Sequence, residues 1–184
     1  MGDGQKKAND SDLDVIREYW GTYGGWVSLI RSPYLAMAML MTAVAYKVWM
    51  ASDWWQMPQA ILPNMLGFSL AGYAIFLSFG SDSFRGFLSK VEVGGSSAFV
   101  KLTTTFMHFV MLQIVALLYS LVAGFLAKIL VPVDFPLAFL LPVLQMLFWA
   151  IGFMLFCYAL TSTLASVIAI FRVVRWFDVY SRKK

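Results

Sequence analysis

The sequence predicts an all-α fold, an integral membrane bundle of four transmembrane helices with short amphipathic helices at the interface. Composition is the first observation, because 60% of the 184 residues are hydrophobic, only 13% are charged and the mean hydropathy is +0.73; soluble domains are far more polar. The second is a set of apolar runs that each reach or approach the roughly 20 residues needed to cross about 30 Å of hydrocarbon. These runs cover residues 34–51, 60–80, 102–127 and 142–171.

The distribution of lysine and arginine is the third observation, since almost all of them lie on one side of these spans. They gather in the N-terminal segment, in the loop between the second and third spans, and after the fourth span. The two remaining loops contain only Lys128, and Lys47 lies near the outer end of the first span. The positive-inside rule therefore predicts a multi-pass membrane protein with both termini in the cytoplasm. The net charge of +4 is then a topology signal, and no direct nucleic-acid partner is expected.

The chain ahead of the first span is predicted to have two parts. Residues 1–10 are polar and are expected to be disordered. Residues 11–32 are expected to form a cytoplasmic interfacial segment, with a surface helix from Ser11 to Tyr19 that the glycines after it interrupt. No early apolar core precedes a cleavage site, so the first span is expected to remain as a signal anchor.

The transmembrane domain is predicted to cover residues 33–171. Ser32 followed by Pro33 indicates where its first helix begins, since proline is tolerated at the first helical position. In the second span, Pro63 is tolerated if the helix begins near Leu62, and this later start is favoured. Three tryptophans at the far end of the first span predict an aromatic belt at the outer interface: Trp49, Trp54 and Trp55.

Two cytoplasmic elements are expected to contact the membrane surface or a partner. The loop over residues 81–98 has apolar residues at helical spacing, which predicts an amphipathic helix on the anionic inner leaflet. The tail over residues 172–184 combines aromatic and basic residues, as helix ends at an anionic surface do. The basic residues assigned to this lipid or partner surface are Arg85, Lys90, Arg172 and Arg175.

A row of small side chains in the second span predicts a surface for helix packing or for oligomer contacts. Its members recur at steps of four, three and four, so they lie on one face of the helix: Gly67, Ala71, Ala74 and Ser78. Lipid tails are as apolar as leucine, so membrane helices associate where small side chains let their backbones approach.

Polar side chains within the spans are the other candidates for function. They are His108 and Gln113 in the third span and Gln145 and Thr163 in the fourth. His108 is compatible with a hydrogen bond to a neighbouring helix or with a pore or proton path. Gln113 lies near the bilayer centre, so its amide must find another helix, another subunit or water.

The residue patterns of most enzyme classes are missing from the sequence. It has one histidine, one cysteine and no carboxylate within any span, and it has no phosphate-binding glycine pattern ahead of a lysine. No catalytic residue, metal site or cofactor is therefore predicted, and the protein is expected not to be an enzyme. Cys157 cannot form a disulfide within the chain and is expected to be a packing residue.

The block LPNMLGFSLAGYAIFLSFGSDSFRGFL, with SPY ahead of the first span and FRVVRWFDVYSRKK at the end, resembles a group of small bacterial four-span proteins. Some members accompany cytoplasmic effectors in anti-phage defence, and the membrane subunit of the Kiwa system is the nearest named example. The resemblance implies an inner-membrane homo-oligomer that senses envelope perturbation and binds a cytoplasmic effector. No family catalytic residues carry over.

Sequence reasoning thus favours a non-enzymatic scaffold or sensor subunit that forms homo-oligomers and recruits or regulates a cytoplasmic protein. A homo-oligomeric channel is the alternative, with Gln113 or the polar stripe of the fourth span facing the axis. A small-molecule transporter is a second alternative.

Overall fold

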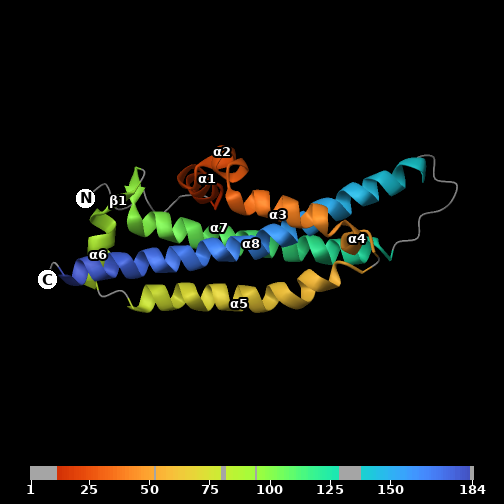
Figure 1. Cartoon of the computed structure of the whole chain (residues 1–184). Helices are drawn as coiled ribbons and strands as arrows, with labels where there is room; N and C mark the ends of the chain where they lie inside the picture. Colours follow the sequence, from red (N-terminus) through yellow and green to blue (C-terminus); the bar gives the residue numbers. More distant parts are fainter. Residues whose placement is uncertain (1–11, 52, 80–81, 94, 129–137, 183–184) are drawn as a thin grey trace.

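The computed structural model describes residues 12–51, 53–79, 82–93, 95–128 and 138–182. This part of the chain is almost entirely helical, which confirms the all-α prediction. Three of its helices are long and apolar enough to cross a membrane, and they run side by side along the long axis of the molecule (Figure 1). They are α5 (Gln56–Phe79), α7 (Ala98–Leu126) and α8 (Leu141–Arg182). These helices indicate a multi-pass membrane protein.

The first predicted span differs from the expectation of one helix over residues 34–51. It forms α3 (Pro33–Val44) and the single turn α4 (Tyr46–Trp49), which meet at Ala45. Twelve residues extend only about 18 Å, less than the thickness of the hydrocarbon layer. The indole N–H of Trp49 turns back and donates to the Thr42 carbonyl at 2.8 Å, which satisfies an acceptor near the end of α3. The predicted start after Ser32 is confirmed.

The second predicted span begins earlier than expected. Its helix starts at Gln56, so the prediction of a start near Leu62 is wrong and Pro63 lies inside the helix. Pro63 has no N–H to donate to the carbonyl of Gln59, and a proline at such a position bends a helix. The orange start of α5 indeed runs at an angle to its yellow remainder (Figure 1).

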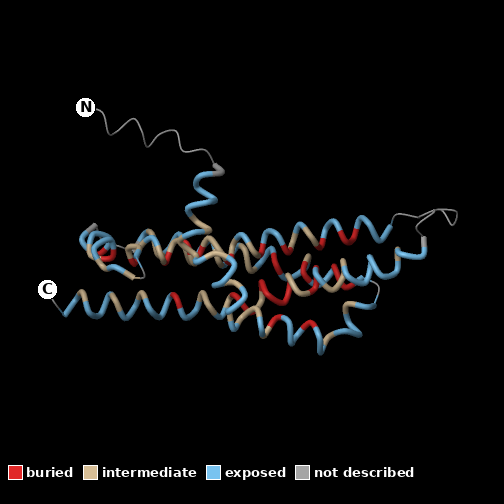
Figure 2. The backbone as a smooth tube through the Cα atoms, turned by 90° about the horizontal axis from the view of Figure 1, so that it is seen from above, coloured by how far each residue is buried: buried red, intermediate tan, exposed pale blue. Residues whose placement is uncertain are grey.

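The long helices pack as an open row. Helix α3 packs on α8, α8 on α7, and α7 on α5, so α3 and α5 lie at the two edges. Only 6% of the most apolar stretch of α5 is buried, against 33% in both α7 and α8. Figure 2 shows that buried residues form only short stretches between longer exposed and intermediate ones. Most of the surface of α5 is therefore open to lipid or to another protein.

Two buried glycines let the bundle close tightly near α4. Trp54 and Trp55, which the sequence predicted as part of an aromatic belt at the outer interface, are only 2% and 8% exposed. Their rings instead pack inside the bundle, Trp54 over Gly152 of α8 and Trp55 over Gly124 of α7. Only a residue without a side chain leaves room for an indole at that distance, which explains why the rings turn inward.

The segment predicted to be interfacial forms two helices, and the first is longer than the expected helix from Ser11 to Tyr19. Helix α1 (Asp12–Tyr23) continues through Gly21, and α2 (Gly25–Ile30) follows after a break. The break lies at Gly24 and Gly25, whose φ angles of 105° and 62° strongly favour glycine. Helix α1 packs on α7.

Helix α6 (Asp82–Lys90) has its apolar face against the protein. Phe84 and Leu88 are buried, and the ring of Phe84 meets Phe177 and Tyr180 near the end of α8. This face is therefore covered by α8 instead of by the lipid leaflet that the sequence predicted. We call this end of the bundle, where α6 meets α8, the α6 end.

A small hairpin joins α6 to α7. Strands β1 (Glu92–Val93) and β2 (Ser96–Ser97) pair antiparallel. The hydroxyl of Ser97 accepts from the N–H of Val100 and caps α7, which begins at Ala98, four residues before the predicted span.

Helix α8 follows a short 3₁₀ turn, η2 (Ala138–Leu140), and has 42 residues. At 1.5 Å per residue it is about 63 Å long, roughly twice the hydrocarbon thickness. The basic tail is thus the continuation of α8 up to Arg182. Residues 1–10, Gly80 and the loop over 129–137 lie outside the described residues.

Candidate functional site

The polar centre of the described structure is an aromatic cluster around His108 of α7. The hydroxyl of Tyr19 lies 2.7 Å from Nδ1 of His108, and the hydroxyl of Tyr158 lies 3.2 Å from its Nε2. The Tyr23 ring stacks on the imidazole with centroids 3.9 Å apart and planes 16° from parallel. Both ring nitrogens and one ring face of His108 are therefore used within the chain. We call these four residues the His108 cluster.

The His108 cluster holds α1 against the bundle. Tyr19 and Tyr23 are four residues apart on α1, so they lie on one face of that helix. A second contact fixes the end of α1, because Nζ of Lys101 donates to the Thr22 carbonyl at 2.7 Å. The sequence predicted His108 as an intramembrane polar residue; its partners were found only in the fold.

Burial changes the acidity of the tyrosines on α1. It raises the pKa of Tyr19 from 10.0 to about 12, and the nearby Tyr158 phenol adds to the shift. Burial also raises the pKa of Tyr23. Both phenols therefore stay protonated at neutral pH and keep their hydroxyl hydrogens for hydrogen bonding.

The raised pKa of Tyr19 predicts that α1 detaches at alkaline pH. A detached phenol ionises near pH 10, whereas the docked one resists to about 12. Docking is therefore fully stable below pH 10 and loses stability as the pH rises from 10 to 12. Tyrosine ionisation is followed by absorbance at 295 nm in the wild type and in Tyr19→Phe. The wild type should show one more phenol that ionises well above pH 10 than the variant does. A difference spectrum with its midpoint at pH 10 would contradict the prediction.

Gln113 finds its partner on a neighbouring helix. Its side chain is fully buried, and its Nε2 donates to the hydroxyl of Ser69 on α5 at 3.2 Å. The same hydroxyl also lies 3.3 Å from Oε1 of Gln113. The sequence left three kinds of partner open for Gln113: another helix, another subunit or water. In the structure the partner is a residue of another helix. A pore lined by Gln113 gains no support from this geometry, and the amide instead ties α5 to α7.

The other intramembrane polar residues do not join Gln113. Gln145 is exposed near the start of α8 and lies beside Lys128 and Trp149. The hydroxyl of Thr163 donates to the Leu160 carbonyl of its own helix at 2.6 Å. Thr163 also lines a groove together with Ser69, the partner of Gln113, whereas His108 and Gln145 line other cavities.

The row of small residues on α5 faces away from the rest of the chain. All four members, Gly67, Ala71, Ala74 and Ser78, are exposed. A Cβ atom added at Gly67 would have no other heavy atom within 4 Å. Within the chain, tight packing against glycine occurs instead at Gly124 and Gly152. The row thus does not serve to pack the helices of one copy.

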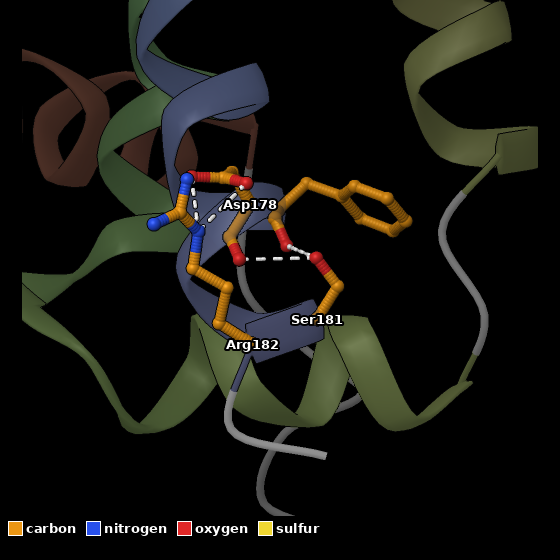
Figure 3. A network of polar contacts seen from close by, with 4 residues as sticks. Asp178, Ser181 and Arg182 are labelled. Atoms are coloured by element: carbon orange, nitrogen blue, oxygen red, sulfur yellow. Dashed lines mark hydrogen bonds and ion pairs between the residues drawn. The ribbon is translucent and has the colours of Figure 1, made fainter.

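The predicted basic surface residues gather at the α6 end. Arg85 and Lys90 lie on α6, Arg172 and Arg175 lie on the part of α8 that approaches it, and all four are exposed. Close to them, Nε of Arg182 pairs with the Asp178 carboxylate at 3.1 Å (Figure 3). Ser181 donates to the Phe177 carbonyl beside that pair, at 3.0 Å. These i to i+4 contacts support the last turn of α8 in water.

Groups suited to metal binding are not brought together. Within the described ranges, no three His, Cys, Asp or Glu side chains lie close enough to hold a metal ion. Cys157 is buried in the apolar core, as expected of a packing residue.

Sequence reasoning missed the partners of the polar residues. The spacing of Tyr19 and Tyr23 could have revealed an aromatic face on α1. Nothing in the sequence pairs Ser69 with Gln113, because the two are 44 residues apart and on different helices.

The chain matches no protein-family model, and comparisons with curated proteins and with solved structures find no match. The function is therefore inferred from the chain's own geometry.

Proposed function

We propose that this protein is a non-enzymatic scaffold or sensor subunit of the bacterial inner membrane that forms homo-oligomers. In this proposal the outer face of α5 joins the copies, and the α6 end faces the cytoplasm and receives a protein partner. Anti-phage defence, with a role like that of the Kiwa membrane subunit, is the proposed setting and rests on the sequence resemblance.

The observation that carries the proposal is the exposed row of small residues on an edge helix. Helix α5 contacts the bundle mainly through α7, its four small residues are exposed, and a Cβ added at Gly67 meets open space. Helices in lipid associate through such surfaces because close backbone approach increases dispersion contacts. A second copy placed against α5 would bury this face.

The cytoplasmic orientation is supported by charge. The exposed arginines and lysine of the α6 end are Arg85, Lys90, Arg172 and Arg175. Lysine and arginine accumulate on the cytoplasmic side of membrane proteins, where anionic lipid headgroups attract them. The same surface could attract an acidic partner protein.

Replacing Gly67 or Ala71 with leucine should reduce the size of the purified particle. The new side chain would hold apart the backbones of two copies, whereas within one copy both positions are exposed and a Cβ added at Gly67 meets open space. Mass photometry of the protein in detergent and in nanodiscs measures the change. An unchanged mass for both variants would contradict oligomerisation through this face.

Gly72→Leu is the matched control for this experiment. Gly72 lies on the same helix, and an added Cβ there also has no heavy atom within 4 Å. It lines the groove between α5 and α8, away from the row of small residues. The control should keep the wild-type mass. A loss of mass in this variant alone would indicate that the copies meet at the groove and not at the row of small residues.

A further inference from the structure

A cavity of about 300 Å³ lies where the connection between α2 and α3 faces α7 and α8. Ser28, Arg31, Ser32 and Tyr34 line it from the connection, and His108 and Tyr158 line it from the long helices. The volume is at the small end of the range for ligand sites. The proposed scaffold function makes no use of this cavity.

The hydrogen-bonding capacity of the cavity is concentrated on the connection between α2 and α3. On the opposite side, the hydroxyls of Thr105 and Ser162 donate to carbonyls of their own helices, each at 2.8 Å. In contrast, the four side chains from the connection form no hydrogen bond or ion pair with any residue that the structure describes. Three hydroxyl groups and a guanidinium group are thus able to donate to a ligand.

The charge of the side chains that line the cavity favours an anion as ligand. Arg31 is the one permanently charged side chain among the described residues that line it, and none of those residues is acidic. Helix α3 begins at the same place, and the Ser32 side chain does not cap it. The first N–H groups of a helix carry partial positive charge, which adds to the field of the arginine. The planar fork of an arginine matches the oxygens of a phosphate group.

We propose that this cavity binds a phosphate group, with Arg31 as its cationic ligand and Ser28, Ser32 and Tyr34 as hydroxyl donors. The group belongs to a soluble phosphate compound or to the headgroup of a phospholipid, since α3 begins the membrane-entering part of the chain. The site is distinct from the outer face of α5, so it stands or falls independently of the proposed oligomer.

Arg31→Gln is the variant that tests the site, and Arg17→Gln is its matched control. Both remove one positive charge from an exposed side chain in the same segment, but Arg17 lies on α1, pairs with Asp14 and does not line the cavity. Purified full-length protein in detergent is titrated calorimetrically with inorganic phosphate and, at matched ionic strength, with chloride. In parallel, protein released from nanodiscs of phosphatidylglycerol and phosphatidylcholine is weighed by native mass spectrometry to count retained phosphatidylglycerol.

The expected result is binding that falls at least about tenfold in Arg31→Gln and is unchanged in Arg17→Gln, because a charged hydrogen-bonding partner is lost. Saturable binding of free phosphate identifies a soluble ligand; retention of phosphatidylglycerol without phosphate binding identifies a headgroup. Absence of both, equal binding by all three proteins, or an equal loss in both variants would overturn the proposal.

Discussion

Replacing Gly152 with alanine should destabilise the folded protein by about 1–3 kcal/mol, the usual cost of overpacking a core. An added Cβ would lie 2.5 Å from Cη2 of Trp54 and 2.6 Å from Cε1 of Tyr119. Neither ring can move away easily, because Trp54 is nearly fully buried and the hydroxyl of Tyr119 donates to the Phe148 carbonyl at 2.9 Å. The unfolding temperature in detergent, followed by tryptophan fluorescence, measures the loss.

Gly72→Ala is the matched control for Gly152→Ala. Both glycines lie within long helices, but a Cβ at Gly72 meets open space. Alanine there should leave stability unchanged or raise it by up to about 1 kcal/mol, since alanine favours the helix. Equal unfolding temperatures for the two variants would contradict the packing of Trp54 over Gly152.

Replacing His108 with alanine should release α1 from the bundle. The change removes the hydrogen bond to Tyr19 and the stacked contact with Tyr23, and leaves the Lys101 contact and the side-chain hydrogen bond between Tyr23 and Tyr158 in place. A hydrogen bond and an aromatic stack together contribute about 2 kcal/mol, so opening of α1 should be roughly 30-fold more frequent. Hydrogen–deuterium exchange of the α1 amides, read by mass spectrometry, measures this change.

Thr105→Ala is the control for the release of α1. Thr105 lies on the same helix one turn away, and its hydroxyl donates to the carbonyl of Lys101. Exchange of α1 should therefore stay at the wild-type rate in this variant. If α1 also exchanged at the wild-type rate in His108→Ala, the His108 cluster would not be what holds it.

Several features could be read from local patterns in the chain. Long apolar runs identified α5, α7 and α8, since the thickness of the hydrocarbon layer fixes how many residues a helix needs to cross it. The start of α3 at Pro33 followed from the fixed φ angle of proline. The exposure of the row of small residues on α5 agrees with a docking surface, although spacing alone could not say whether α7 or a second copy would meet it.

Other features depended on contacts between distant segments. Trp54 and Trp55, expected at the outer interface, pack inside the bundle because Gly152 and Gly124 on other helices leave space for their rings. The apolar face of α6 packs on Phe177 and Tyr180 of α8 instead of on lipid. Spacing along the chain cannot reveal which apolar face another helix covers, because apolar side chains are equally favourable in lipid and in a protein interior.

The sequence by itself determined that the protein is helical and that three of its segments are long and apolar enough to cross a membrane. Those properties follow from the energy of placing each residue in water or in hydrocarbon, which is a sum over local segments. Only the tertiary structure decided which polar groups meet. His108 with two tyrosines of α1, Gln113 with Ser69, and Arg31 beside a cavity lined by α7 and α8 each depend on how helices far apart in the chain pack together.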